Sequence, residues 1–67
     1  MTHEQLLTML QALVASGRKV TLTIGEAGFC AVVHARQEGK YVPVYAVCEK
    51  DMILALQNVV THEEVQA

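Results

Sequence analysis

The first hydrophobic pattern of the chain has the spacing of a helix. Its apolar stripe consists of Leu6, Met9, Leu10, Leu13 and Val14. Thr2, with Gln5 three residues later, forms a capping-box pattern, which is typical of the start of a helix. Gly17 suits the left-handed conformation that often follows the last helical turn. The sequence therefore predicts a helix over residues 2–15.

After Lys19 the hydrophobic period changes from helical spacing to strict alternation. Val20, Leu22 and Ile24 alternate with two threonines, as in a strand with one buried face. Two further strands are predicted over residues 29–36 and 41–47. Short polar and glycine-containing segments at 25–28 and 37–40 separate the three strands, so a three-stranded antiparallel meander is expected.

The two predicted turns fix the expected register of the sheet. A first turn centred on 26–27 and a second centred on 38–39 predict these opposite pairs: Ile24–Phe29, Leu22–Ala31, Val20–Val33, Ala35–Val42, Val33–Val44 and Ala31–Ala46. All these residues are apolar and would share one inner face, whereas a slip of one residue in either strand would exchange the faces. The agreement between the two turns supports this register.

A second amphipathic helix is predicted to begin near Glu49. Its apolar side consists of Met52, Ile53, Leu56, Val59 and Val60, with Leu54 outside this stripe. Thr61 with Glu64 repeats the capping-box pattern, so over residues 61–67 we expect either a short extra helical turn or fraying. The predicted fold is a single α+β domain over residues 1–67, a two-layer α-β-β-β-α arrangement with both helices on the inner face.

The same register predicts an outer face that is unusually apolar for a solvent-exposed surface. Its candidate partner-binding residues are Thr21, Cys30, Val32, His34, Tyr41 and Tyr45. An apolar centre with a polar rim and exposed tyrosines is typical of a protein-binding surface. The alternative is that valine, threonine and tyrosine occur here only because they favour strands.

The edges of the predicted sheet differ in their capacity to pair with another chain. Pro43 lacks a backbone N–H, which fits an edge strand and discourages further pairing there. The first strand is then the free edge, available to a strand from a partner or simply exposed to water.

The size and composition of the chain indicate that the folded domain needs a stabilising partner. The chain has 67 residues, of which 52% are hydrophobic, and a formal net charge of −2. A domain of this size buries only about 60% of its unfolded surface, so a partner is expected, with a homodimer favoured. The five basic residues are scattered, which makes nucleic acid an unfavoured partner. No signal-like or membrane-spanning apolar run occurs and two cysteines suggest a reducing compartment, so a cytoplasmic location is expected.

The sequence offers little support for catalysis, metals or cofactors. Cys30 and His34 lie four residues apart on one strand face, roughly 13 Å, which is too far for a shared metal or a nucleophile–base pair. Cys30 and Cys48 have opposite parity in the predicted register, which argues against a disulfide and predicts a buried Cys48 and an accessible Cys30 thiol. We expect no catalytic residues, no metal and no cofactor.

Three functions remain open from the sequence. The first is a small non-catalytic protein-interaction module, of the regulator, inhibitor or antitoxin type. The second is RNA binding, because the element order resembles that of the double-stranded RNA-binding domain, although the helix start at 48–51 and the loop at 26–27 carry acidic residues where that family is basic. The third is a subunit of a larger assembly that completes a neighbour's sheet through the first strand.

Overall fold

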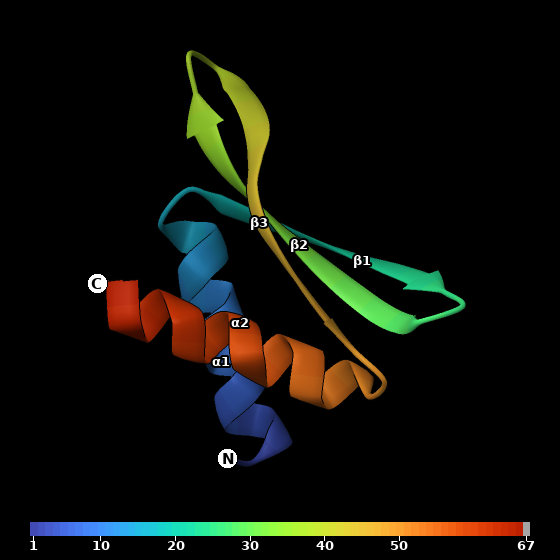
Figure 1. Ribbon diagram of the computed structural model, residues 1–67. Coiled ribbons are helices and arrows are strands. Elements are labelled where there is room, and N and C mark those ends of the chain that lie inside the picture. Colours follow the sequence, from blue (N-terminus) through green and yellow to red (C-terminus); the bar gives the residue numbers. More distant parts are fainter. Residues whose placement is uncertain (67) are drawn as a thin grey trace.

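The computed structural model describes residues 1–66 and has the predicted order of elements (Figure 1). The elements are α1 (His3–Ala15), β1 (Arg18–Gly25), β2 (Gly28–Gln37), β3 (Lys40–Glu49) and α2 (Met52–Gln66). The three strands form one antiparallel sheet in the order β1-β2-β3. The α+β meander predicted from the sequence is therefore confirmed, with β1 and β3 as its two edges.

The beginning and end of α1 follow the local sequence signals. The Gln5 N–H donates to Thr2 Oγ1 at 3.1 Å, and the Thr2 N–H donates to Gln5 Oε1 at 2.9 Å. This reciprocal pair is the capping box, which satisfies two donors at the helix start. Gly17 follows the helix with φ +98, in the region that favours glycine.

The first hairpin has the predicted register. Val20 lies opposite Val33, Leu22 opposite Ala31 and Ile24 opposite Phe29. The second hairpin also turns where expected, with φ +51 at Glu38 and φ +80 at Gly39. Positive φ at both central residues suits a two-residue turn whose twist matches that of the flanking strands.

The predicted register of β3 is wrong beyond its first residues. Ala35 lies opposite Val42 as expected and His34 lies opposite Pro43, but Val33 then lies opposite Tyr45. Val44 is the extra residue of a β-bulge, at a point where Pro43 supplies no N–H to a regular ladder.

The bulge exchanges the faces of all later residues in β3. The predicted pairs Val33–Val44 and Ala31–Ala46 do not form; Ala31 lies opposite Val47, and Val32 lies opposite Ala46. Tyr45 and Val47 therefore join the inner face, whereas Ala46 and Cys48 join the outer face.

The second helix begins later than predicted and is continuous. Asp51 caps it, with Oδ1 accepting from the Ile53 N–H at 2.8 Å and the Leu54 N–H at 3.1 Å. Thr61 Oγ1 donates to the Gln57 carbonyl at 3.0 Å within the helix, so residues 61–66 continue α2 and form neither of the two expected alternatives, a separate extra turn or a frayed end. Any fraying at residue 67 lies outside the described residues.

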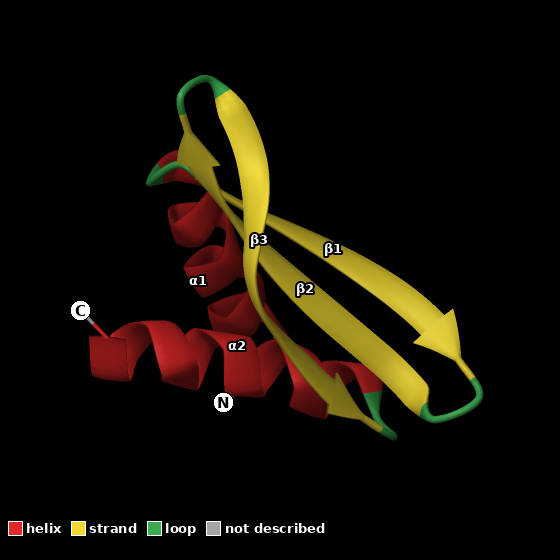
Figure 2. Ribbon diagram, turned by 45° about the horizontal axis from the view of Figure 1, so that its top comes forward, coloured by secondary structure: helices red, strands yellow, loops and turns green. Residues whose placement is uncertain are grey.

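Both helices lie on one side of the sheet (Figure 2). The largest fully buried side chains are Val33 and Val59, which pack with Ala31 at the centre of the core. α1 contacts β1 and α2, whereas α2 contacts β2 and β3. Val33 is thus on the inner face and Val32 on the outer face, as predicted.

The helices do not cover the whole inner face. The tip of the β1–β2 hairpin extends beyond them in both ribbon views (Figures 1 and 2). Leu22 is consequently 39% exposed and Ile24 73% exposed. The expectation that both lie beneath the helices is wrong, because α2 packs on β2 and β3 and the part of β1 near the turn extends beyond α1.

Candidate protein-binding surface

Five of the six candidate partner-binding residues lie together on the outer face. Thr21 is directly opposite Val32, and its Oγ1 donates to the Val32 carbonyl at 3.5 Å. Cys30 and His34 flank Val32 on β2, and Tyr41 is opposite the next outward residue, Arg36. The sheet therefore groups these side chains on the side that neither helix covers (Figure 2).

Tyr45, the sixth candidate, lies on the inner face because of the bulge. Its hydroxyl donates to Glu63 Oε1 at 3.0 Å, and its ring centroid is 4.1 Å from that of His62. Burial raises the pKa of the Tyr45 hydroxyl well above its ordinary value, and the hydrogen bond to Glu63 adds to this effect. Tyr45 therefore joins β3 to α2 and does not contribute to the outer surface.

The same bulge brings Cys30 and Cys48 together in a disulfide. Their Cα atoms lie directly opposite each other, 4.0 Å apart, on β2 and β3. The prediction of a buried Cys48 and an accessible Cys30 thiol is therefore wrong, because it assumed a β3 without an extra residue. Because both cysteines are joined in a disulfide, they no longer indicate a reducing compartment. The disulfide does not by itself fix a location.

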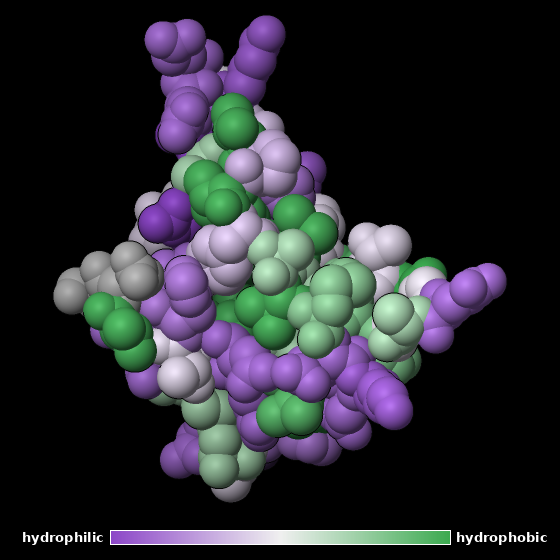
Figure 3. Space-filling model, viewed as in Figure 1, coloured by the Kyte–Doolittle hydropathy of each residue, from purple (hydrophilic) through white to green (hydrophobic). Residues whose placement is uncertain are grey.

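The outer face has an apolar centre and a polar margin. Val32 and the exposed Ala46 lie side by side, with Pro43 further along β3. At the margin, Tyr41 is 46% exposed and the Lys19 Nζ lies 5.6 Å from the centre of its ring. In Figure 3, hydrophobic residues gather over β2 and β3 in the middle of the view, above the position of α2. Hydrophilic residues occupy the tips of the two hairpins.

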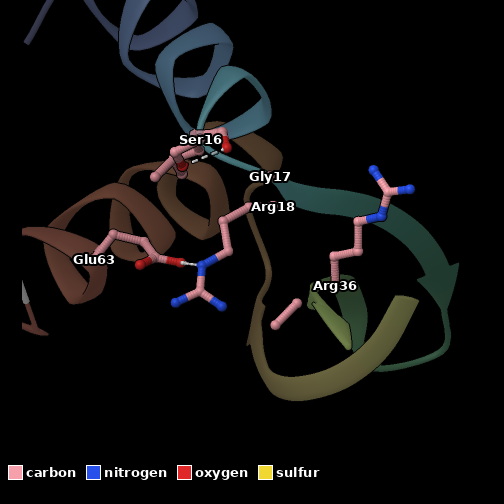
Figure 4. A pocket seen from close by; sticks show the side chains of 7 residues that line it. Ser16, Gly17, Arg18, Arg36 and Glu63 are labelled. Carbon is pink, nitrogen blue, oxygen red and sulfur yellow. Dashed lines mark hydrogen bonds and ion pairs between the residues drawn. The ribbon is translucent and has the colours of Figure 1, made fainter. Parts of the chain in front are cut away.

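A hollow between the end of α1, the start of β1 and α2 has a different composition. Two arginines, Ser16 and Glu63 lie around it (Figure 4). Arg18 Nε is 3.5 Å from Glu63 Oε1, whereas the Arg36 side chain points away from this ion pair (Figure 4). Ser16 Oγ donates to the Leu13 carbonyl at 2.8 Å. The arginines do not converge on one point, and the Ser16 hydroxyl is engaged at the helix end.

The described part of the chain, residues 1–66, has neither a metal-binding cluster nor a membrane-spanning helix. Within that part of the chain, no group of three or more His, Cys, Asp and Glu side chains is placed to hold a metal ion. No helix there has the length and apolar character needed to cross a membrane.

A second apolar surface, the α1–β1 groove, was not predicted from the sequence. It is lined chiefly by Leu7, Leu10 and Val14 of α1, Val20 and Leu22 of β1, and Leu56 of α2. Leu7 is 57% exposed and Val14 60% exposed. Leu7 lies next to the predicted stripe of the first helix, and Val14 belongs to that stripe but is not covered by the core. Together they make the apolar side of the helix wider than one layer of the core can cover, and this width was the available signal.

Comparison with known proteins adds no relative: no family model, curated protein sequence or solved structure matches this chain.

Proposed function

We propose that this chain is a small non-catalytic protein-interaction module that binds a protein partner through the outer face of its sheet. The observation that carries the proposal is the apolar centre formed by Val32, Ala46 and Pro43 on the side of the sheet that no helix covers. Interfaces are distinguished by such an apolar centre with few charges and by aromatic side chains, here Tyr41.

The construction of the face supports a binding role. The Cys30–Cys48 disulfide ties β2 to β3 within the face, and the bulge at Val44 is one residue from Pro43. A surface held in one conformation loses less conformational entropy when a partner binds. A small rigid surface of this kind suits a regulator, an inhibitor or an antitoxin. The proposal also includes the cytoplasmic location expected from the sequence.

The contacts of the basic residues favour this proposal over RNA binding. Arg18 is paired with Glu63, and Lys19 lies over the Tyr41 ring. RNA binding requires basic groups directed at phosphates. A salt-sensitive gel shift with duplex RNA tests the RNA-binding alternative. A third alternative is that β1 completes the sheet of a neighbouring subunit in a larger assembly.

Replacing Val32 with lysine is expected to weaken partner binding by at least about thirty-fold, since a hot-spot residue at the centre of an interface contributes about 2 kcal/mol or more. The fold is expected to persist, because lysine is tolerated on an exposed strand face. The measurement is affinity capture from the native cell with the unmodified chain, followed by dissociation constants of the captured protein for each variant.

Val65→Lys is the matched control. It introduces the same side chain on α2, at a position that is 75% exposed and lies away from the outer face. Binding is expected to be unchanged in this variant. If Val32→Lys and Tyr41→Ala both bind as tightly as the control, the outer face is not the binding surface.

A further inference from the structure

The β1 edge is the less protected of the two edges of the sheet. β1 runs over eight residues, Arg18–Gly25, without a proline or a bulge, whereas β3 carries both. Edge strands present unpaired backbone N–H and C=O groups, and proteins normally protect them by proline, bulges or charge. β1 carries charge only at its first two residues, so most of this edge remains open to another strand.

The sequence of β1 and the following turn is complementary to itself. When two copies run antiparallel with Leu22 on a two-fold axis, Val20 lies opposite Ile24, and Thr21 lies opposite Thr23. Lys19 then lies opposite Gly25, and Arg18 lies opposite Glu26, its charge complement. Apolar residues meet on the inner face, threonines meet on the outer face, and opposite charges meet at both ends.

Neighbouring registers lack this complementarity. An axis at Thr21 would set Arg18 opposite Ile24, and an axis at Thr23 would set Val20 opposite Glu26. Both shifts pair a charge with an apolar side chain. Arg18 can serve Glu63 and a partner's Glu26 together, because the guanidinium has five N–H donors.

The same axis covers the apolar surface that the chain itself leaves exposed. Ile24, 73% exposed, would lie beside Val20 of the second copy, which packs against that copy's core and lines its α1–β1 groove. Each groove would thus receive the end of the other copy's β1. The accessible surface is 4720 Å², whereas a compact monomer of 7.3 kDa is expected to expose about 4,200 Å². The surplus is what an unpartnered interface would add.

We propose that two copies of this chain form a two-fold dimer in which their β1 strands pair antiparallel about Leu22, giving one six-stranded sheet with all four helices on one side. A self-complementary patch is the requirement for such a symmetric interface. The dimer uses the β1 edge and the α1–β1 groove, and so goes beyond the proposed function, which uses the outer face.

The first test is the mass of the protein in solution, measured by analytical ultracentrifugation across a hundred-fold range of concentration. The expected mass is twice 7.3 kDa. Ile24→Lys is expected to give a monomer with an unchanged circular dichroism spectrum, because Ile24 is exposed in the single chain and only the dimer would bury it. Val65→Lys, the control at 75% exposure, is expected to remain a dimer.

The second test is the register. Under mild oxidation, Leu22→Cys is expected to give a dimer linked by a disulfide, since the two substituted positions would face each other on the axis. Ile24→Cys is expected to stay unlinked, because its opposite residue is Val20. A monomeric parent protein, a dimer that survives Ile24→Lys, or linking at 24 rather than 22 would each overturn the proposal. Val32 lies on the outer face, away from the inner-face residues of the proposed dimer contact. The loss of partner binding in Val32→Lys can therefore be distinguished from the loss of the dimer in Ile24→Lys.

Discussion

Removing the disulfide with the double variant Cys30→Ser/Cys48→Ser is expected to lower the free energy of unfolding by about 3 kcal/mol. The bond closes a loop with a sequence separation of 18 residues, and opening it gives the unfolded chain more conformations. A domain of 67 residues has a total stability of only about 3–10 kcal/mol, so this is a large share. Thermal unfolding followed by circular dichroism should show a midpoint lower by about 12–24 °C.

The parent protein treated with a reductant is the control for this prediction. It should unfold at nearly the same temperature as the double variant, because both lack the cross-link and keep the same strands. The intact oxidised protein should also fail to react with a thiol-alkylating reagent. Two reactive thiols in the untreated protein, or a midpoint that reductant does not move, would contradict the assigned pair.

Gly28→Ala is expected to cost about 2–4 kcal/mol, because it combines an unfavourable backbone conformation with a steric clash. Gly28 has φ +117, and a Cβ there would lie 2.6 Å from the Glu49 carbonyl oxygen and 3.0 Å from the Lys50 Cα. These are backbone atoms at the end of β3, which cannot rotate away. Denaturant unfolding of the parent and variant gives the difference in free energy.

Alanine substitutions at two other glycines distinguish the effect of the backbone conformation from that of the steric clash. Gly39 has φ +80 but nothing within 4 Å of an added Cβ, so Gly39→Ala reports the backbone effect alone. Gly25 has neither feature, and Gly25→Ala is expected to be neutral or to stabilise by up to about 1 kcal/mol. Equal losses at positions 25 and 28 would contradict the close approach of the β1–β2 turn to the end of β3.

The parts of the fold specified by local chemistry were predictable from sequence. The capping box at Thr2 and Gln5, and the turns at 25–28 and 37–40, depend on residues close together in the chain. The apolar face of the first hairpin follows from strict alternation along β1 and β2. These features required no knowledge of how the sheet packs.

The bulge was not predictable by counting alternation. Both Val44 and Tyr45 are compatible with an inner position, so the pattern fits β3 with or without an extra residue. The choice depends on tertiary contacts: Tyr45 reaches Glu63 and His62 on α2, and the shift allows Cys48 to meet Cys30. Pro43 was the local signal, since proline within a strand often accompanies a bulge.

The exposure of Leu22 and Ile24 was also hidden from the sequence. Alternation shows that the two residues share a face with Val20, but it does not show how far the helices extend over that face. α1 packs on β1 and α2, and the part of β1 near the turn extends beyond it. For the candidate surface, therefore, alternation placed the candidate residues of β1 and β2 on the face where the structure has them, whereas it misplaced Tyr45 on β3.

The extra residue in β3 determines which side chains of that strand lie on the outer face beside Val32 and which contact α2. Nuclear Overhauser spectroscopy tests this arrangement directly through the Hα protons of Cys30 and Cys48 and the rings of Tyr45 and His62. Strong contacts within both pairs are expected, because the Cα atoms of the first are 4.0 Å apart and the ring centroids of the second 4.1 Å. Contacts pairing Ala31 with Ala46, and a Tyr45 ring without contacts to α2, would contradict the account.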